Sequence, residues 1–202
     1  MDKKCDVYYK VRKTIIEMLH DRNYTVTDEE KNLNYSDFSE KFYENQINFE
    51  GTYKDNDDKL ILIYFFLENK TFGKKDLVGL KTLVNEKYVD KDLNIIIVLQ
   101  DKPTSQINKE ILIEDYKNIE IFLVKNLLVN VTKHIFVPKH EILSQEEGKK
   151  ILEKFKCTRL QLPKILSSDA IAKYYGMKPG QICKITRNSN ITGESIYYRL
   201  VK

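Results

Sequence analysis

The stretch HIFVPKHEILSQEEGKKILEKFKCTRLQLPKILSSDAIAKYYGMKPGQICKITRNSNITGESIYYRLVK, residues 134–202, decides the fold of the last third of this 202-residue chain. Ser144 and Glu147 form a capping box, in which each side chain reaches the free backbone N–H of the other residue. Apolar residues then recur at helical spacing, at Ile151, Leu152 and Phe155. This pattern predicts a helix that begins directly after Ser144.

The rest of the same stretch predicts a second, short helix and a pair of strands. Ser167 or Ser168 is the expected cap of this helix, with Asp169 in its first turn, and Gly176 falls where a helix end needs left-handed backbone. Two strands, 181–187 and 195–201, follow and are joined by a polar loop. Short helices and strands in this order indicate a small α+β domain.

These motifs resemble, in the same order, the assembly domain of the fifth subunit shared by the eukaryotic nuclear RNA polymerases, a subunit that has an archaeal counterpart. The matching positions are His134, Val137-Pro138, His140, Gln161-Leu162-Pro163-Lys164-Ile165, Asp169-Ala170-Ile171-Ala172-Lys173-Tyr174-Tyr175-Gly176, Gly180-Gln181, Lys184-Ile185, Arg187 and Tyr198-Arg199-Leu200-Val201. The chain departs from the family at Ala170, Lys173, Pro179 and Asn188. These departures indicate a divergent member.

Before residue 130 the chain predicts a separate α/β domain. Residues 5–20 and 36–43 have helical periodicity, and Ser36 is the expected cap of the second helix. Strands are predicted near 47–53, 60–67, 93–99 and 119–124, with one helix carrying Leu77, Leu80, Leu83 and Val84 and another from Pro103 to Tyr116. This order implies a mixed, partly parallel sheet and two domains, 1–129 and 130–202.

The motif Asp21-Arg22-Asn23-Tyr24 resembles the opening of the same family, so the resemblance covers the whole chain, more weakly before residue 130. It implies a restriction-endonuclease-like jaw domain followed by the small assembly domain. It also implies a non-catalytic subunit of a multisubunit DNA-dependent RNA polymerase. No cofactor, catalytic residue or metal ligand is expected in this chain, because the catalytic magnesium of these enzymes belongs to the largest subunit.

Charge is distributed unevenly between the two predicted domains. Residues 1–130 carry 20 basic and 24 acidic side chains, whereas residues 131–202 carry 14 basic and 6 acidic ones. A basic domain favours phosphates or acidic protein surfaces, and composition does not choose between them. The aromatic pairs Tyr174-Tyr175 and Tyr197-Tyr198 lie among these cations. Packing of one tyrosine of each pair in the core, with the others as anchors of a protein interface, fits these pairs better than stacking on nucleic-acid bases.

The resemblance implies two sets of contacts. Contacts of the C-terminal domain with the largest subunit and other polymerase subunits are expected at His134, Pro138, His140, Gln161, Pro163, Tyr174, Tyr175, Lys184, Arg187, Tyr198 and Arg199. Contacts of the jaw with downstream double-stranded DNA are expected at Lys10, Arg12, Lys13, Lys74 and Lys75. The last strand also offers a sheet edge that a partner strand can complete.

Two other functions compete with this one. Glu68-Asn69-Lys70 follows a buried strand, with Asp55, Asp57 and Asp58 upstream, and nucleases of the restriction-endonuclease type place such groups around a divalent metal. A solvated loop explains this short pattern better, because charged residues are frequent throughout the chain. His134, His140 and Cys157 lack an acidic third partner for catalysis. A free-standing nucleic-acid-binding protein is the other alternative.

The sequence also bears on the compartment. Three scattered cysteines without a CxxC pair fit a reducing environment and argue against zinc. The segment MDKKCDVYYK lacks the apolar centre of a signal peptide, and no apolar run is long enough to span a membrane. We therefore expect an intracellular protein. A cellular member would act in the nucleus, and a member from a large cytoplasmic DNA virus would act in the host cytoplasm and enter the virion.

Overall fold

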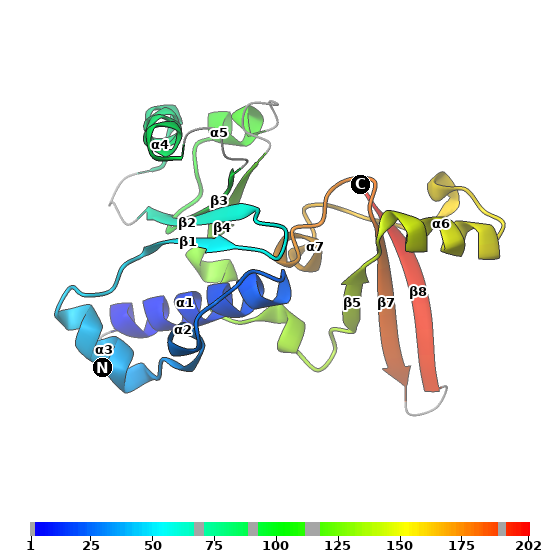
Figure 1. Cartoon of the computed structure of the whole chain (residues 1–202), viewed down its shortest axis with the longest axis horizontal. Helices are drawn as coiled ribbons and strands as arrows, with labels where there is room; N and C mark the ends of the chain where they lie inside the picture. Colours follow the sequence, from blue (N-terminus) through cyan, green and yellow to red (C-terminus); the bar gives the residue numbers. More distant parts are fainter. Residues whose placement is uncertain (1–2, 67–70, 89–92, 112–117, 190–192) are drawn as a thin grey trace. The chain divides into compact units, whose positions relative to one another are not determined.

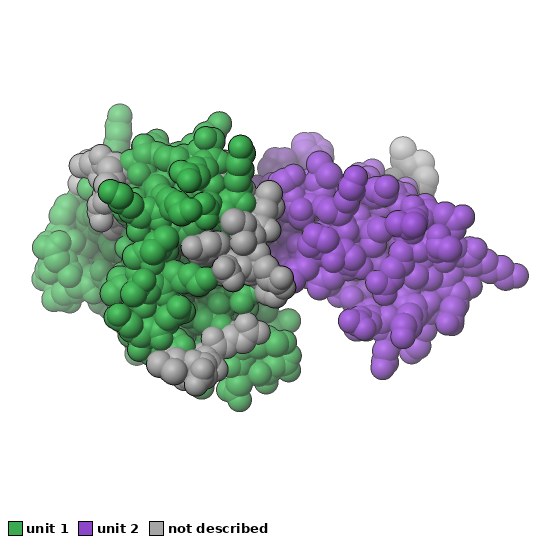
Figure 2. Space-filling view, turned by 90° about the horizontal axis from the view of Figure 1, so that it is seen from above, with its two compact units in different colours: residues 1–129 green, residues 130–202 purple. Residues whose placement is uncertain are grey.

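The structure, a computed structural model, describes residues 3–66, 71–88, 93–111, 118–189 and 193–202. It divides into two compact units, Met1–Val129 and Asn130–Lys202, which are coloured separately in Figure 2. Each unit contains a four-stranded sheet and buries an apolar core of its own. We call them unit 1 and unit 2 and describe each by itself.

Unit 1 begins with the helices α1 (Lys3–Asp21), α2 (Asp28–Asn32) and α3 (Tyr35–Tyr43). The predicted first helix is confirmed by α1. The sequence predicts no helix where α2 lies, although Thr27 and Glu30 form a capping box there. The side chain of Asn34 accepts the backbone N–H of Asp37 and caps α3, so the prediction that Ser36 is the cap is wrong. Asn34 is preferred because its carbonyl oxygen reaches the third helical N–H from the extended residue before the helix.

The sheet of unit 1 consists of β1 (Glu50–Lys54), β2 (Leu60–Phe66), β3 (Leu93–Leu99) and β4 (Ile119–Leu123), in that order. β1 is antiparallel to β2, and the other neighbours are parallel, so the predicted mixed sheet is confirmed. In Figure 1, α4 (Lys74–Lys87) and α5 (Ser105–Glu110) lie over one face of the sheet and α1 lies over the other. Helices on both faces explain why β2 and β3 are almost entirely apolar, with Asn94 of β3 as the exception.

Two details of these helices differ from the prediction. Leu83 is expected on the apolar stripe of α4, but it is 64% exposed while Leu80 and Val84 are buried in the core. α5 begins at Ser105, after Thr104, and not at Pro103, and the predicted end of this helix at Tyr116 lies outside the described residues. Both differences arise because apolar periodicity locates the middle of a helix better than its end residues or the residues at the border of its apolar stripe.

Unit 2 is built on a second sheet with the order β5-β7-β8-β6. Its strands are β5 (Lys139–Ile142), β6 (Lys164–Ile165), β7 (Ile182–Ser189) and β8 (Gly193–Val201), and its helices are α6 (Gln145–Lys154) and α7 (Ala170–Tyr174). Short 3₁₀ turns lie at Val131–Lys133 and Arg159–Gln161, and another at Val124–Asn126 precedes unit 2. The predicted helices and the β7–β8 pair are confirmed, whereas β5 and β6 are strands too short to predict from alternation.

The local signals in unit 2 act as expected, with one exception. Ser144 and Glu147 form the predicted capping box of α6, and Gly176 has the predicted left-handed backbone, with φ of 62°. The cap of α7 is Asp169, which accepts the N–H of Ile171, and neither Ser167 nor Ser168.

No helix in the described part of the chain combines the length and the apolar character needed to cross a membrane.

Candidate partner-binding surface

The β7–β8 hairpin sets the geometry of the surface, because its two faces are covered at one end only. Ile185, Cys183 and Val201 pack with Ala172 of α7 and with Met177 on one face. On the other face α6 lies so close that a Cβ added to Gly148 would come within 3.3 Å of Ile182 Cδ1. Figure 1 shows the hairpin extending past both helices toward its tip. The distal half of the hairpin is therefore accessible on both faces.

Unit 2 exposes many large apolar side chains for its size. Ile135 and Phe136 are 89% and 85% exposed and lie in the turn before β5. Other exposed members are Ile142, Phe155, Leu160, Leu166, Ile196 and Tyr197. Single exposed apolar residues are ordinary, but several of them on one small unit make it a candidate for protein interaction.

A hollow of about 700 Å³ lies beside the two most exposed of these residues. Its walls are Ile135, Phe136, Val137, Pro138, Lys139, Glu141, Lys184, Thr186, Arg187, Asn188 and Glu194. They come from the turn before β5 and from β5, β7 and β8. The hollow therefore joins an apolar rim to a charged floor.

Charges on the floor of this hollow are partly paired. The Glu141 carboxylate forms ion pairs with Nζ of Lys139 at 2.6 Å and with Nζ of Lys184 at 3.2 Å. These two ammonium groups lower the pKa of Glu141, with Lys139 contributing most. Arg187 is exposed and lies 5.9 Å from the centre of the Tyr197 ring. The walls carry three cations, Lys139, Lys184 and Arg187, against two carboxylates, Glu141 and Glu194, which leaves an excess of one positive charge.

Several residues predicted to bind a partner also make contacts within unit 2. Tyr174 is only 3% exposed in the isolated chain, and its predicted contact with a partner stays a prediction. Nδ1 of His140 donates to the carbonyl of Pro138 at 2.7 Å. Gln161 accepts the N–H of Thr158 at 2.7 Å and shapes the turn before β6. These side chains are used within the fold, and the backbone carbonyl of Pro163 likewise accepts the N–H of Leu200 at 2.8 Å.

Other predicted contacts lie on the accessible surface of unit 2. His134, Arg187 and Arg199 are exposed, and Tyr175, Lys184 and Tyr198 are half-buried. The Tyr198 ring packs 5.8 Å from that of Phe155. Sequence reasoning missed the exposed pair Ile135-Phe136. Their position in a segment of turns was the one feature of the sequence that indicated exposure, because connecting segments run over the protein surface.

The cations predicted to contact DNA fall into two groups. Lys10 pairs with Asp6 at 2.7 Å, and Lys74 pairs with Glu110 at 2.6 Å. Lys13 and Lys75 are exposed and have no carboxylate partner among the residues that the structure describes. Of the predicted lysines, these two combine exposure with a charge that no described carboxylate neutralises.

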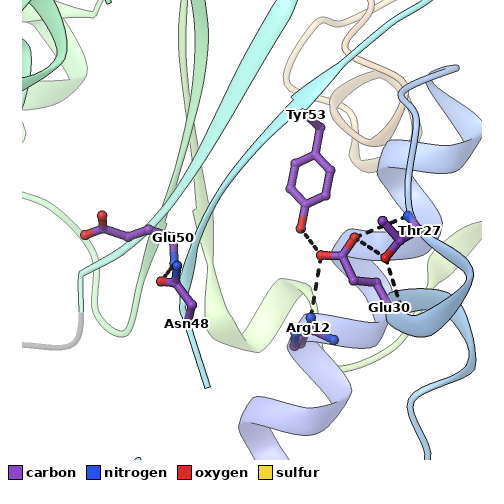
Figure 3. Close-up of polar contacts among 6 residues, drawn as sticks. All are labelled: Arg12, Thr27, Glu30, Asn48, Glu50 and Tyr53. Carbon is purple, nitrogen blue, oxygen red and sulfur yellow. Dashed lines mark hydrogen bonds and ion pairs between the residues drawn. The ribbon is translucent and has the colours of Figure 1, made fainter. Parts of the chain in front are cut away.

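Arg12 occupies a different environment from the lysines. Figure 3 shows its guanidinium beside Glu30, with an N–O distance of 3.7 Å, while Tyr53 donates a 2.7 Å hydrogen bond to the same carboxylate. Thr27 donates to the second carboxylate oxygen through its N–H and its hydroxyl. Burial, followed by the hydrogen bond to Glu30 and its negative charge, raises the pKa of Tyr53. Glu30 of α2 therefore links Arg12 of α1 to Tyr53 of β1, and the Arg12 side chain is only 20% exposed.

Asp55, one of the acidic residues considered for a nuclease site, has a structural role. Asp55 accepts the N–H groups of Asp57 and Lys59 at 2.9 and 2.8 Å and so closes the turn between β1 and β2. Glu68 and Lys70 lie outside the described residues. Among the residues that are described, no three His, Cys, Asp or Glu side chains are grouped to hold a metal ion.

Comparison with known families identifies the class of protein to which both units belong. The family model for the C-terminal domain of RNA polymerase Rpb5 matches residues 129–201, and the model for the N-terminal domain of Rpb5 matches residues 2–85. The two matches follow the order of the two units. The chain therefore belongs to the Rpb5 family, whose members are non-catalytic subunits of DNA-directed RNA polymerases.

Individual relatives are similar along almost the full chain. Subunit 5B of RNA polymerases IV and V from Arabidopsis thaliana is 31% identical, over 98% of this chain and 91% of the relative. Subunit RPABC1 of RNA polymerases I, II and III is 32% identical in Caenorhabditis briggsae, over 96% and 94% of the two chains. Its counterpart in Dictyostelium discoideum is 35% identical, over 95% of each.

Proposed function

We propose that this chain is a non-catalytic subunit of a multisubunit DNA-directed RNA polymerase, in which unit 2 docks on the largest subunit. Family membership and the names of the similar proteins support the polymerase. The observation that supports docking by unit 2 is the pair of highly exposed apolar residues, Ile135 and Phe136, that line a hollow with a small excess of positive charge. An apolar rim with Tyr and Arg beside it has the composition of an interface core.

The partner that this surface fits is a protein with a mixed apolar and acidic patch. Ile135 and Phe136 are almost fully exposed, so burying them removes apolar surface from water at about 25 cal/mol per Å². Arg187 and Lys184 favour a carboxylate next to that apolar contact. Both properties support docking on an acidic region of the largest subunit.

We propose that unit 1 forms part of the jaw near downstream double-stranded DNA. Unit 1 is net acidic, so its contacts with phosphates must be local, and Lys13 and Lys75 are the candidates whose charge no described carboxylate neutralises. The mixed sheet with helices on both faces supports a restriction-endonuclease-like arrangement for this unit. This role needs no chemistry from the chain.

A nuclear location accompanies this function. The relatives named above are subunits of polymerases from a plant, a nematode and a social amoeba, which supports a nuclear, cellular protein. None of these three relatives is viral, so they lend no support to a virion location. A fluorescently tagged chain expressed in its own host should accumulate in the nucleus, and a cytoplasmic signal that persists throughout growth would contradict this assignment.

The docking proposal is tested by co-expressing the full chain with the largest subunit of the same organism and measuring how much is recovered in a pull-down. The substitution Phe136→Asp should reduce recovery at least about tenfold, because a charge replaces a buried apolar contact. Leu83→Asp is the matched control, since Leu83 is an exposed apolar residue of unit 1. Equal recovery of both variants would contradict docking through this surface.

A further inference from the structure

The two long sides of β8 are paired very unequally. On one side β8 pairs with β7 along its whole length, from Gly193 opposite Ser189 to Leu200 opposite Ile182. On the other side it pairs only with the two residues of β6, at Leu200 and Val201. In Figure 1 the outer side of the distal part of β8 faces no other described strand of unit 2. Most of β8 is therefore an open sheet edge.

Backbone alternation shows which groups point toward this open edge. The N–H of Leu200 donates to the Pro163 carbonyl on the β6 side at 2.8 Å, and the N–H of Val201 donates to Gln181 on the β7 side at 2.9 Å. Successive residues of a strand point their backbone groups to opposite sides. The N–H and C=O groups of three residues thus face the open edge, those of Glu194, Ile196 and Tyr198.

The short length of β6 has a physical cause in the sequence. A parallel ladder that continued past Leu200 would need an N–H at position 163 to bond the Tyr198 carbonyl. Pro163 has no N–H, so the chain cannot supply this bond. Within the described residues, no strand pairs with the backbone groups of β8 that lie beyond β6. Another chain can therefore bond to them.

We propose that an extended segment of the largest polymerase subunit adds to the β8 edge at Glu194–Tyr198 and continues the row begun by β6. This inference rests on the proposed function and specifies the contact by which the chain joins its partner. Main-chain hydrogen bonds supply the affinity in this mode of recognition, and alternate side chains supply the specificity.

Side chains along β8 define the chemistry of the incoming segment. Ile196 and Tyr198 lie on one face with Phe155 beside them, and Tyr197 and Arg199 lie on the other with Arg187. Cross-strand neighbours lie about 4.5–5.5 Å apart between Cβ atoms. The segment should therefore alternate apolar side chains on the first face with acidic side chains on the second.

Charge also separates this partner from a second copy of the chain. Residues 131–202 carry 14 basic and 6 acidic side chains, so two copies joined edge to edge would bring two basic units together. Like charges directly opposite one another across a strand pair are destabilising. An acidic segment of another protein gains from the same charges that oppose self-pairing.

The test is hydrogen–deuterium exchange, resolved to single amides, on the full chain alone and in complex with the largest subunit. The amides of Ile196 and Tyr198 should exchange fast in the free chain and at least about 100-fold more slowly in the complex. The amides of Ser195 and Tyr197 already face β7 and should change much less. Complex formation without protection at Ile196 and Tyr198 would overturn the inference and leave the proposed function standing. Failure to form the complex would overturn both.

A proline substitution provides an independent test. Ile196→Pro removes an N–H that the β7 ladder does not use, so the chain should fold, while association with the largest subunit should fall at least about tenfold. Ile196→Val keeps the edge and is the matched control. Unchanged association of folded Ile196→Pro would refute the added strand. If this variant does not fold, the exchange experiment decides. Protection of the same amides in a dimer of the free chain would assign the edge to a second copy and would overturn the inference.

Discussion

Asn130 Nδ2 donates a 3.0 Å hydrogen bond to the Tyr174 hydroxyl, and both side chains are buried. Asn130 also accepts the N–H and the hydroxyl of Thr132 through Oδ1, at 3.0 and 2.6 Å. The pair therefore fastens the first turn of unit 2 to α7. A tyrosine that resembles a docking residue in sequence thus stabilises the fold.

Replacing Tyr174 by Phe should lower the free energy of unfolding by about 1 kcal/mol, because a buried donor loses its acceptor. Chemical denaturation monitored by circular dichroism measures this change. Association with the polymerase should stay at the wild-type level. A variant of normal stability with weakened association would restore the docking role predicted from sequence.

Arg199→Ala should weaken association with the largest subunit about tenfold or more, because Arg199 is exposed beside the β8 edge and carries the charge expected to meet a carboxylate. Its hydrogen bond to the Lys164 carbonyl is long, at 3.3 Å, so the isolated variant should remain folded. Copurification measures the effect. The control is Lys41→Ala, an exposed cation of unit 1, and equal loss in both variants would argue against a specific role for Arg199.

The three cysteines should differ in reactivity. Burial raises the pKa of the Cys183 thiol to about 11, and Cys183 and Cys5 are both 0% exposed, whereas Cys157 is half-buried. Alkylation of the native protein at pH 8, followed by mass spectrometry, should label Cys157 first. Rapid labelling of Cys183 would show that the sheet of unit 2 opens easily.

The same thiol predicts a pH dependence of stability. A folded-state pKa above the unfolded value of about 8.5 means that the stabilisation is complete below about pH 8.5 and is lost as the pH rises toward about 11. The free energy of unfolding of the wild type should therefore fall more steeply between pH 8.5 and pH 10 than that of Cys183→Ala. Parallel curves for the two proteins would contradict this.

Asp55→Ala should destabilise unit 1. We expect no enzyme activity that this substitution could abolish. Its carboxylate closes the β1–β2 turn through two backbone N–H groups, and removing it should cost about 1 kcal/mol. The purified wild-type chain should not cleave DNA in the presence of Mg²⁺. Magnesium-dependent cleavage that disappears in Glu68→Ala or Lys70→Ala would establish the nuclease alternative instead.

We expect each of the substitutions Lys13→Ala and Lys75→Ala to weaken the binding of downstream DNA by the assembled polymerase. Each should also reduce the slope of log affinity against log salt concentration by about the value of one phosphate contact. Lys10→Ala should have less effect, because Lys10 is paired with Asp6. Titration of labelled DNA at several salt concentrations measures both quantities. Tight, steeply salt-dependent binding by the isolated chain would favour a free-standing nucleic-acid-binding protein.

Sequence predicted the large elements of this fold because their physical signals are local. The apolar run of β3 and the capping box at Ser144 each depend on residues within one element. Short elements were missed for the opposite reason. The two residues of β6 become a strand only because β8 lies beside them, and no pattern two residues long encodes a partner elsewhere in the chain.

The predicted partner contacts stay predictions, because family resemblance does not separate residues that bind a partner from residues that support the fold. His140 and Tyr174 match the family and bond within the chain. Ile135 and Phe136 have the hydrophobicity of core residues and are exposed in the structure. Exposure is a property of the packed unit, so it could not be predicted from hydrophobicity alone.

Affinity purification of the tagged chain from its own cells, with quantitative mass spectrometry of the proteins recovered, tests the central claim most directly. We expect the subunits of a DNA-directed RNA polymerase in amounts equal to that of the tagged chain, and the largest subunit among those lost first when Phe136 is changed to Asp. Recovery of the chain alone, or with partners unrelated to transcription, would contradict its assignment as a polymerase subunit.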